Sequence, residues 1–142
     1  MAPRTHVAVS ETGESPFAVR IETSAHHLIG DEPISAGGGG LGPTPFDLMT
    51  AALAECTAMT VRWFARQQGW PLEHVEVEVE HRKVVLVGAT SPVDLFEKAI
   101  SLRGPLLTDE QLERLLDVAG KCPIQRVLEG TPKITSILRH RL

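Results

Sequence analysis

The segment Pro45–Gln68 constrains the fold most, because it is predicted to be a long helix with apolar residues on every face. Thr44 before Pro45 marks its start, since proline is favoured at the first helical position. Gly69 ends it, with Pro71 just beyond. A helix that is apolar all round must be enclosed all round. The other predicted helices and strands of this chain are too few to enclose the long helix. We therefore expect a homodimer, in which a second copy covers the exposed flank.

Composition predicts an ordinary globular chain. The 142 residues, 42% hydrophobic and 23% charged, fit a single domain over residues 1–142. A net charge of −4 argues against a nucleic-acid partner, which needs a basic face. The N-terminus lacks the apolar core of a signal peptide, so a cytoplasmic location is expected. Asp47, Glu55 and Arg62 interrupt the long helix, which argues against a membrane span.

Hydrophobic alternation and turn residues predict short strands and helices on both sides of the long helix. A capping box at Thr108 marks a second helix that ends at Gly120, and Cys122-Pro123 opens a third. The predicted order βββ-α-ββ-αα-β has its strands mainly in hairpins, which indicates an α+β fold with antiparallel sheets. Strands are expected over Val7–Thr12, Phe17–Ala25, His26–Ile29, Glu73–Val87, Leu95–Leu102 and Lys133–Arg141.

The glycine-rich segment Ala36–Pro45 precedes the long helix. A phosphate-binding loop of the Walker type needs Lys followed by Ser or Thr at the helix start. Pro43-Thr44-Pro45 stands there instead. We interpret the glycines as a hinge or crossover that leads into the helix, and we expect no nucleotide cofactor.

The two cysteines, Cys56 and Cys122, are the candidates for chemistry. In a reducing compartment two cysteines are more often free thiols or a transient redox pair than a structural disulfide. Cys122 stands at a predicted helix start beside Lys121, with Arg126 one turn onward, a setting that favours the reactive thiolate. Cys56 lies mid-helix beside Glu55, where a cation or donor from another element would be needed. The plainer alternative for each is a small core residue.

Three segments together resemble the OsmC/Ohr family of thiol peroxidases. They are the glycine-rich loop with Gly42-Pro-Thr-Pro-Phe-Asp-Leu48, the run Ala51–Thr60 that contains Cys56, and Lys121–Leu128 with Cys122. The resemblance extends over nearly the whole chain and its order of elements.

The resemblance implies an intertwined homodimer, in which antiparallel sheets wrap the long central helices and the active sites lie at the subunit interface. Cys56 matches the peroxidatic cysteine, which attacks an organic hydroperoxide and becomes a sulfenic acid. Cys122 matches the cysteine that condenses with it to a disulfide, trapping the sulfenic acid before over-oxidation. An external dithiol, a lipoyl group in the best-known branch, then reopens the disulfide, and no bound cofactor is expected.

The sequence departs from this family pattern at the partners of Cys56. Family peroxidases pair an Arg in the first hairpin turn with a Glu at the start of the long helix. The turn Thr12–Pro16 contains no Arg, and Phe46 occupies the position of the Glu. Asp47 is the candidate replacement for the Glu, although an acid there also suits the helix dipole. Arg20 is the nearest candidate cation.

His26 and His27, with Asp31 and Glu32 nearby, are the candidate ligands for a metal ion. Adjacent residues of a strand point to opposite faces, so the two histidines are poorly placed to share an ion, and no metal is expected.

The leading hypothesis is a thiol-dependent peroxidase for organic hydroperoxides, acting in oxidative-stress defence. Cys56 is its nucleophile, Cys122 its resolving thiol, and Asp47 a supporting residue. One alternative is a non-catalytic dimer that binds a small lipophilic ligand. Another is a redox sensor in which the same two cysteines form a disulfide without turnover.

Overall fold

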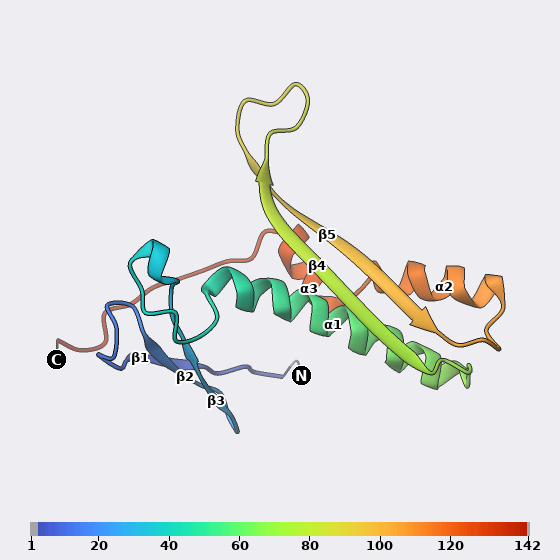
Figure 1. The fold of residues 1–142 in the computed structure, drawn as a ribbon, viewed down its shortest axis with the longest axis horizontal. Helices are drawn as coiled ribbons and strands as arrows, with labels where there is room; N and C mark the ends of the chain where they lie inside the picture. Colours follow the sequence, from blue (N-terminus) through green and yellow to red (C-terminus); the bar gives the residue numbers. More distant parts are fainter. Residues whose placement is uncertain (1–2, 142) are drawn as a thin grey trace. The chain divides into compact units, whose positions relative to one another are not determined.

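The computed structural model describes residues 3–141 and contains two compact units, one up to Thr50 and one from Ala51 onward (Figure 1). The predicted α+β class is confirmed, because both sheets are antiparallel and three α-helices accompany them. The elements are β1 (Ala8–Glu11), β2 (Val19–Glu22), β3 (His27–Gly30), the 3-10 turn η1 (Ile34–Ala36), α1 (Pro45–Gln68), β4 (His74–Val84), β5 (Val93–Arg103), α2 (Asp109–Ala119) and α3 (Pro123–Glu129).

The first unit is a three-stranded sheet in the order β1-β2-β3, followed by the glycine-rich loop. Asp31, directly after β3, is buried and accepts hydrogen bonds from Ser15 Oγ and from the backbone N–H of Gly39. The loop also approaches the sheet closely, since a Cβ on Gly42 would lie 1.9 Å from the carbonyl oxygen of Ile29. The glycines therefore let the backbone pack against the end of β3.

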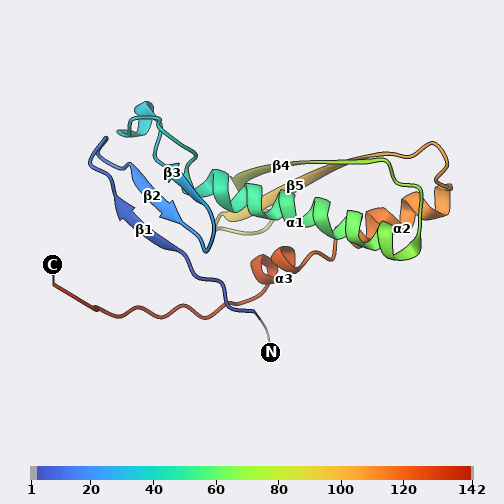
Figure 2. The ribbon, with the colours of Figure 1, turned by 90° about the horizontal axis from the view of Figure 1, so that it is seen from below.

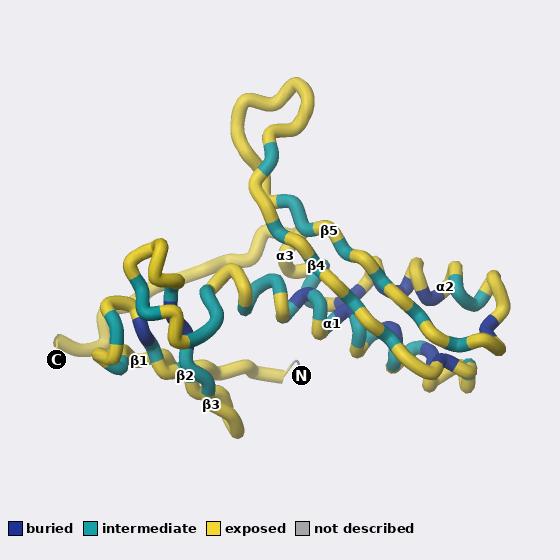
Figure 3. Tube along the Cα trace, in the orientation of Figure 1, coloured by how far each residue is buried: buried dark blue, intermediate teal, exposed yellow. Residues whose placement is uncertain are grey.

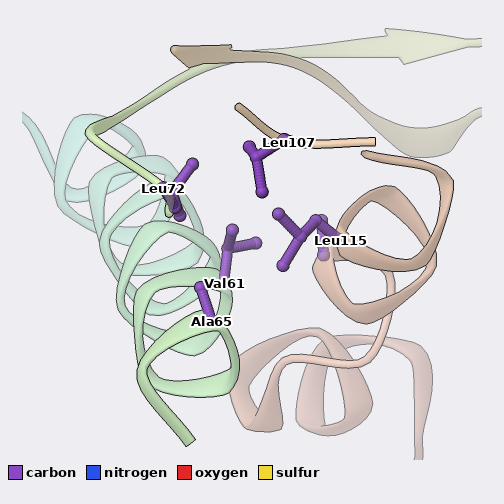
Figure 4. Packing of buried hydrophobic residues seen from close by; sticks show 6 residues of the cluster. Val61, Ala65, Leu72, Leu107 and Leu115 are labelled. Atoms are coloured by element: carbon purple, nitrogen blue, oxygen red, sulfur yellow. The ribbon is translucent and has the colours of Figure 1, made fainter. Parts of the chain in front are cut away.

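The second unit is built on the long β4–β5 hairpin, paired in register from His74↔Arg103 to Val84↔Val93. Within this unit α1 and α2 lie on one face of the hairpin, and α3 lies beyond them (Figure 2). The core between the hairpin and these two helices is a cluster of buried apolar side chains (Figure 4). Its members are Val61, Ala65, Leu72, Leu107, Leu115 and Ala119.

The long helix has the predicted bounds, Pro45–Gln68, but this chain buries only one of its faces. The buried stripe recurs every fourth residue, as expected for one side of a helix, and consists of Leu53, Thr57, Val61 and Ala65. Other apolar residues of the helix are exposed, with Met59 62% and Trp63 61% accessible. Along α1, buried positions are interspersed with intermediate and exposed ones (Figure 3). The need for enclosure that the sequence indicated is therefore unmet within the single chain.

The predicted last strand, Lys133–Arg141, is not formed: residues 131–141 contain no strand or helix. A strand requires hydrogen bonds to a neighbouring strand, and none of the described residues pairs with this segment. Its apolar side chains Ile134, Ile137 and Leu138 are all strongly exposed. No helix among the described residues is long and apolar enough to cross a membrane.

Candidate functional site

Cys56 lies on α1 beside the buried stripe, and its side chain is half-buried. It lines a cavity of about 620 Å³ within the second unit. The other lining residues come from α1, from α3 and from Lys121, which precedes α3, and most of them are apolar. They are Ala52, Glu55, Met59, Thr60, Trp63, Lys121, Pro123, Ile124 and Arg126.

Cys122 is the N-cap of α3, with Pro123 in the first turn, as the sequence predicted. Its side chain is fully buried, and its Sγ accepts a hydrogen bond from the backbone N–H of Gln125 at 3.4 Å. Thr57 Oγ1, on the buried stripe of α1, lies 3.5 Å from the same sulfur. The N-cap position thus directs helix N–H groups at the thiol, which stabilises negative charge there.

Two further groups act on the Cys122 sulfur. Lys98 Nζ, from β5, lies 4.0 Å away, and the Cys56 side chain is close enough to hydrogen-bond to it. Burial raises the pKa of the Cys122 thiol. The hydrogen bonds from Thr57, Gln125 and Cys56, together with the charge of Lys98, outweigh that effect, so the pKa is lower than its ordinary value.

The structure therefore brings Cys56 and Cys122 together, with the first facing a cavity and the second enclosed behind it. Both are free thiols. Of the two cations that the sequence predicts beside Cys122, Lys121 pairs through its Nζ with Asp117 at 3.0 Å, and Arg126 lines the cavity. The charged residues that line the same cavity as Cys56 are Glu55, Lys121 and Arg126.

Asp47 and Arg20, the candidates to replace the missing family partners, both lie in the first unit and have local partners. Asp47 accepts a hydrogen bond from the Thr44 N–H at 2.9 Å, and the Thr44 hydroxyl accepts one from the Asp47 N–H at 3.1 Å. This is a reciprocal cap of α1. Arg20 Nε pairs with Glu22 at 2.7 Å. A role of Asp47 in the chemistry stays a prediction.

Sequence reasoning missed Thr57 and Lys98. A signal for Lys98 was present, because it shares an alternating face of β5 with Phe96 and Ile100, which are partly buried. A lysine on the same strand face as inward-pointing apolar residues is unusual, because its buried charge needs a hydrogen-bond or ion-pair partner. Thr57 gave no comparable signal, since a threonine beside a cysteine in a helix has many ordinary roles.

Within residues 3–141, no group of three or more His, Cys, Asp or Glu side chains is arranged to hold a metal ion.

Comparisons with known proteins extend this picture. A sequence model described as OsmC-like protein matches residues 37–136, whereas no curated protein matches the chain. An OsmC-like protein from Mycoplasma pneumoniae has 15% identity and a TM-score of 0.73, covering 92% of this chain and 90% of that one. An organic hydroperoxide resistance protein OsmC from Legionella pneumophila has 22% identity and a TM-score of 0.65, covering 92% of each chain.

The organic hydroperoxide resistance protein OhrB of Bacillus subtilis is also similar, with 19% identity and a TM-score of 0.57, covering 89% of this chain and 91% of that one. At these identities the structural likeness establishes the fold. The family match spans more than half of the sequence, including both cysteines and the segments that carry them. The chain belongs to the OsmC-like protein family.

Proposed function

We propose that this protein is a thiol-dependent peroxidase that reduces organic hydroperoxides. The observation that carries the proposal is the arrangement of the two thiols: Cys56 lines an apolar cavity, and Cys122 is buried beside it. Similar structures belong to proteins named for organic hydroperoxide resistance. The cavity is lined largely by Ala52, Met59, Trp63 and Ile124, which favours an alkyl substituent over hydrogen peroxide itself.

In the first step the Cys56 thiolate attacks the outer oxygen of the hydroperoxide. The O–O bond breaks, Cys56 becomes a sulfenic acid, and the alkoxide takes up a proton to leave as the alcohol. Arg126 lines the same cavity and is the candidate cation for stabilising both the thiolate and the leaving oxygen. It would serve in place of the Arg that the hairpin turn lacks.

In the second step the Cys122 thiolate attacks the sulfur of the sulfenic acid. A disulfide forms, and hydroxide leaves and is protonated to water. The lowered pKa of Cys122 supports this role, because the attacking species must be the thiolate. An external dithiol, a small molecule or a lipoylated protein, then reduces the disulfide and becomes a disulfide itself.

We also propose that the working form is a homodimer. Met59 and Trp63 line the cavity yet remain mostly exposed. The segment after α3, with its exposed Ile134, Ile137 and Leu138, has no partner strand among the described residues. A second copy would cover both features and narrow the cavity around Cys56. Light scattering at micromolar concentration should give twice the chain mass of 15.4 kDa; a monomer would contradict this proposal.

The enzymatic test measures cumene hydroperoxide consumption with dihydrolipoamide in excess. The wild type is compared with Cys56→Ser and Cys122→Ser, each of which leaves one cysteine because the chain has two. We expect sustained turnover only in the wild type. The Cys122→Ser variant should consume only a few equivalents of peroxide per chain, because Cys56 without its partner is oxidised past the sulfenic acid and stops turning over.

Intact mass and thiol counts separate the other readings. Disulfide formation after one equivalent of peroxide, without turnover with any dithiol, would favour a redox sensor. No disulfide and slow alkylation of Cys56 would favour a binding protein for a lipophilic ligand. Equal background rates in the wild type and Cys56→Ser would refute the peroxidase.

A further inference from the structure

Lys98 is placed unusually for a lysine. It lies on the inward face of β5, where neighbouring side chains pack against the core. Its Nζ donates a hydrogen bond to the carbonyl oxygen of Ala119, the last residue of α2, at 2.8 Å. None of the ion pairs formed within residues 3–141 includes Lys98. The anionic group available to its ammonium is therefore the sulfur of Cys122, 4.0 Å away.

Thr57 supplies a second, switchable donor. Its hydroxyl lies 2.8 Å from the Leu53 carbonyl oxygen and 3.5 Å from Cys122 Sγ. A hydroxyl carries one proton, so it can donate to the carbonyl oxygen or to the sulfur, and a negative charge on Cys122 favours the sulfur. With the Gln125 N–H, three donors then converge on a sulfur that is fully buried.

The two sulfurs thus differ in access and in stabilisation. Cys56 lines the cavity, and Cys122 does not, although its neighbours Lys121 and Pro123 do. A reagent that enters from solvent meets the sulfur of Cys56 first. The hydrogen-bond donors that would stabilise the negative charge of a departing thiolate surround Cys122.

We propose that Thr57 and Lys98 are positioning residues that set the direction of disulfide reduction: the reductant attacks Cys56, and Cys122 departs as a buried thiolate. This proposal rests on the proposed function. The thiolate of the dithiol forms a bond to Cys56 Sγ while the Cys56–Cys122 bond breaks and its electron pair goes to Cys122. The second thiol of the reductant then displaces Cys56, leaving a cyclic disulfide on the reductant and two reduced cysteines.

Thiol–disulfide exchange supports this direction on two grounds. The rate depends on which sulfur the attacking thiolate can reach, and it increases as the pKa of the leaving thiol falls. The reductant reaches Cys56 from the cavity, so Cys56 is the sulfur attacked. The lowered pKa of Cys122, in which hydrogen bonds and Lys98 outweigh burial, selects Cys122 as the leaving group.

The direction is tested by trapping. The wild-type disulfide is prepared with diamide, so the experiment does not depend on peroxidase activity. It is then treated with a monothiol, 2-mercaptoethanol, quenched in acid, alkylated and mapped by mass spectrometry. We expect the mercaptoethanol adduct on Cys56 and the alkyl label on Cys122. The reverse assignment would overturn the proposal, and so would failure of diamide to form the disulfide. Correct trapping without peroxide turnover would refute the proposed function alone.

The role of Lys98 is tested in the Cys56→Ser background, where Cys122 is the only thiol. The ultraviolet absorbance of the thiolate is followed against pH. The titratable groups that face Cys122 are Cys56, removed in this variant, and Lys98. Lys98→Met should lower the thiolate fraction at neutral pH at least about threefold, since one pKa unit is about tenfold. Lys98→Arg should restore it in part.

The matched control is Lys121→Met, which removes the lysine adjacent in sequence to Cys122 but paired with Asp117. It should leave the titration of Cys122 almost unchanged. Thr57→Val should act as Lys98→Met does, while circular dichroism checks that each variant is folded. Identical titration curves for Lys98→Met, Thr57→Val and the parent would overturn the positioning roles.

Discussion

Leu115 joins α2 to the core, and its truncation is the most direct test of the packing that supports the site. The side chain is 0% exposed and contacts the cluster that includes Val61 and Leu107 (Figure 4). Leu115→Ala removes three carbons, worth about 2.4 kcal/mol at ~0.8 kcal/mol per carbon group. A residual cavity adds to this, giving a loss of about 3 kcal/mol in the free energy of unfolding.

The control is the next residue, Leu116, on the same helix and 61% exposed. Leu116→Ala has the same change in side chain and helix propensity, but it should alter the free energy of unfolding by less than about 0.5 kcal/mol. Urea unfolding of both variants and the wild type at one protein concentration, followed by circular dichroism, measures the difference. Equal losses in the two variants would refute the packing argument, and a large loss for Leu116→Ala alone would place that face in an interface.

Three further predictions concern the loop and the buried thiol. Gly42→Ala should cost about 1–3 kcal/mol of stability, as overpacking does, because the added Cβ would lie 1.9 Å from a backbone oxygen. Burial opposes ionisation of Asp31, but hydrogen bonds from Ser15 and from loop N–H groups keep its pKa below the ordinary value. The ionised Asp31 therefore stabilises the fold fully above its unfolded-state pKa, and this stabilisation is lost as pH falls through its folded-state pKa. The Asp31→Asn variant should show a smaller decrease in the free energy of unfolding between neutral and acidic pH. The pKa of Cys122 is also lowered in the folded state, so ionisation of this thiol stabilises the fold as pH rises. The Cys56→Ser variant, which keeps Cys122, should therefore become more stable relative to the variant with both cysteines replaced by serine as pH rises toward about 8.5.

Each of these has its own check. Gly120→Ala places a Cβ no closer than 3.4 Å to its nearest neighbour and should change the urea midpoint little; a loss as large as that of Gly42→Ala would contradict the close approach. Glu14→Gln removes an exposed carboxylate in the same unit and should leave the decrease in stability at acidic pH unchanged. A stability difference between the two cysteine variants that is constant with pH would show that the Cys122 thiolate is not stabilised in the folded state.

The candidate site shows where sequence reasoning succeeds and where it stops. Pro45, Gly69 and the capping box at Thr108 are local signals, and the helices they predicted have the expected starts and ends. The position of Cys122 at a helix start was predictable for the same reason. The involvement of Lys98 was not, because its contact with Cys122 joins residues that only the packing of β5 against the helix ends brings together.

The sequence by itself determined the elements, since helix starts, glycine stops and strand alternation depend on neighbours a few residues apart. It also identified the two thiols. Only the tertiary structure decided which thiol faces a cavity and which is enclosed, because burial depends on side chains distant in sequence. The last predicted strand failed for that reason too: the alternation of residues 133–141 allows a strand, but hydrogen bonds from another strand are needed to form one.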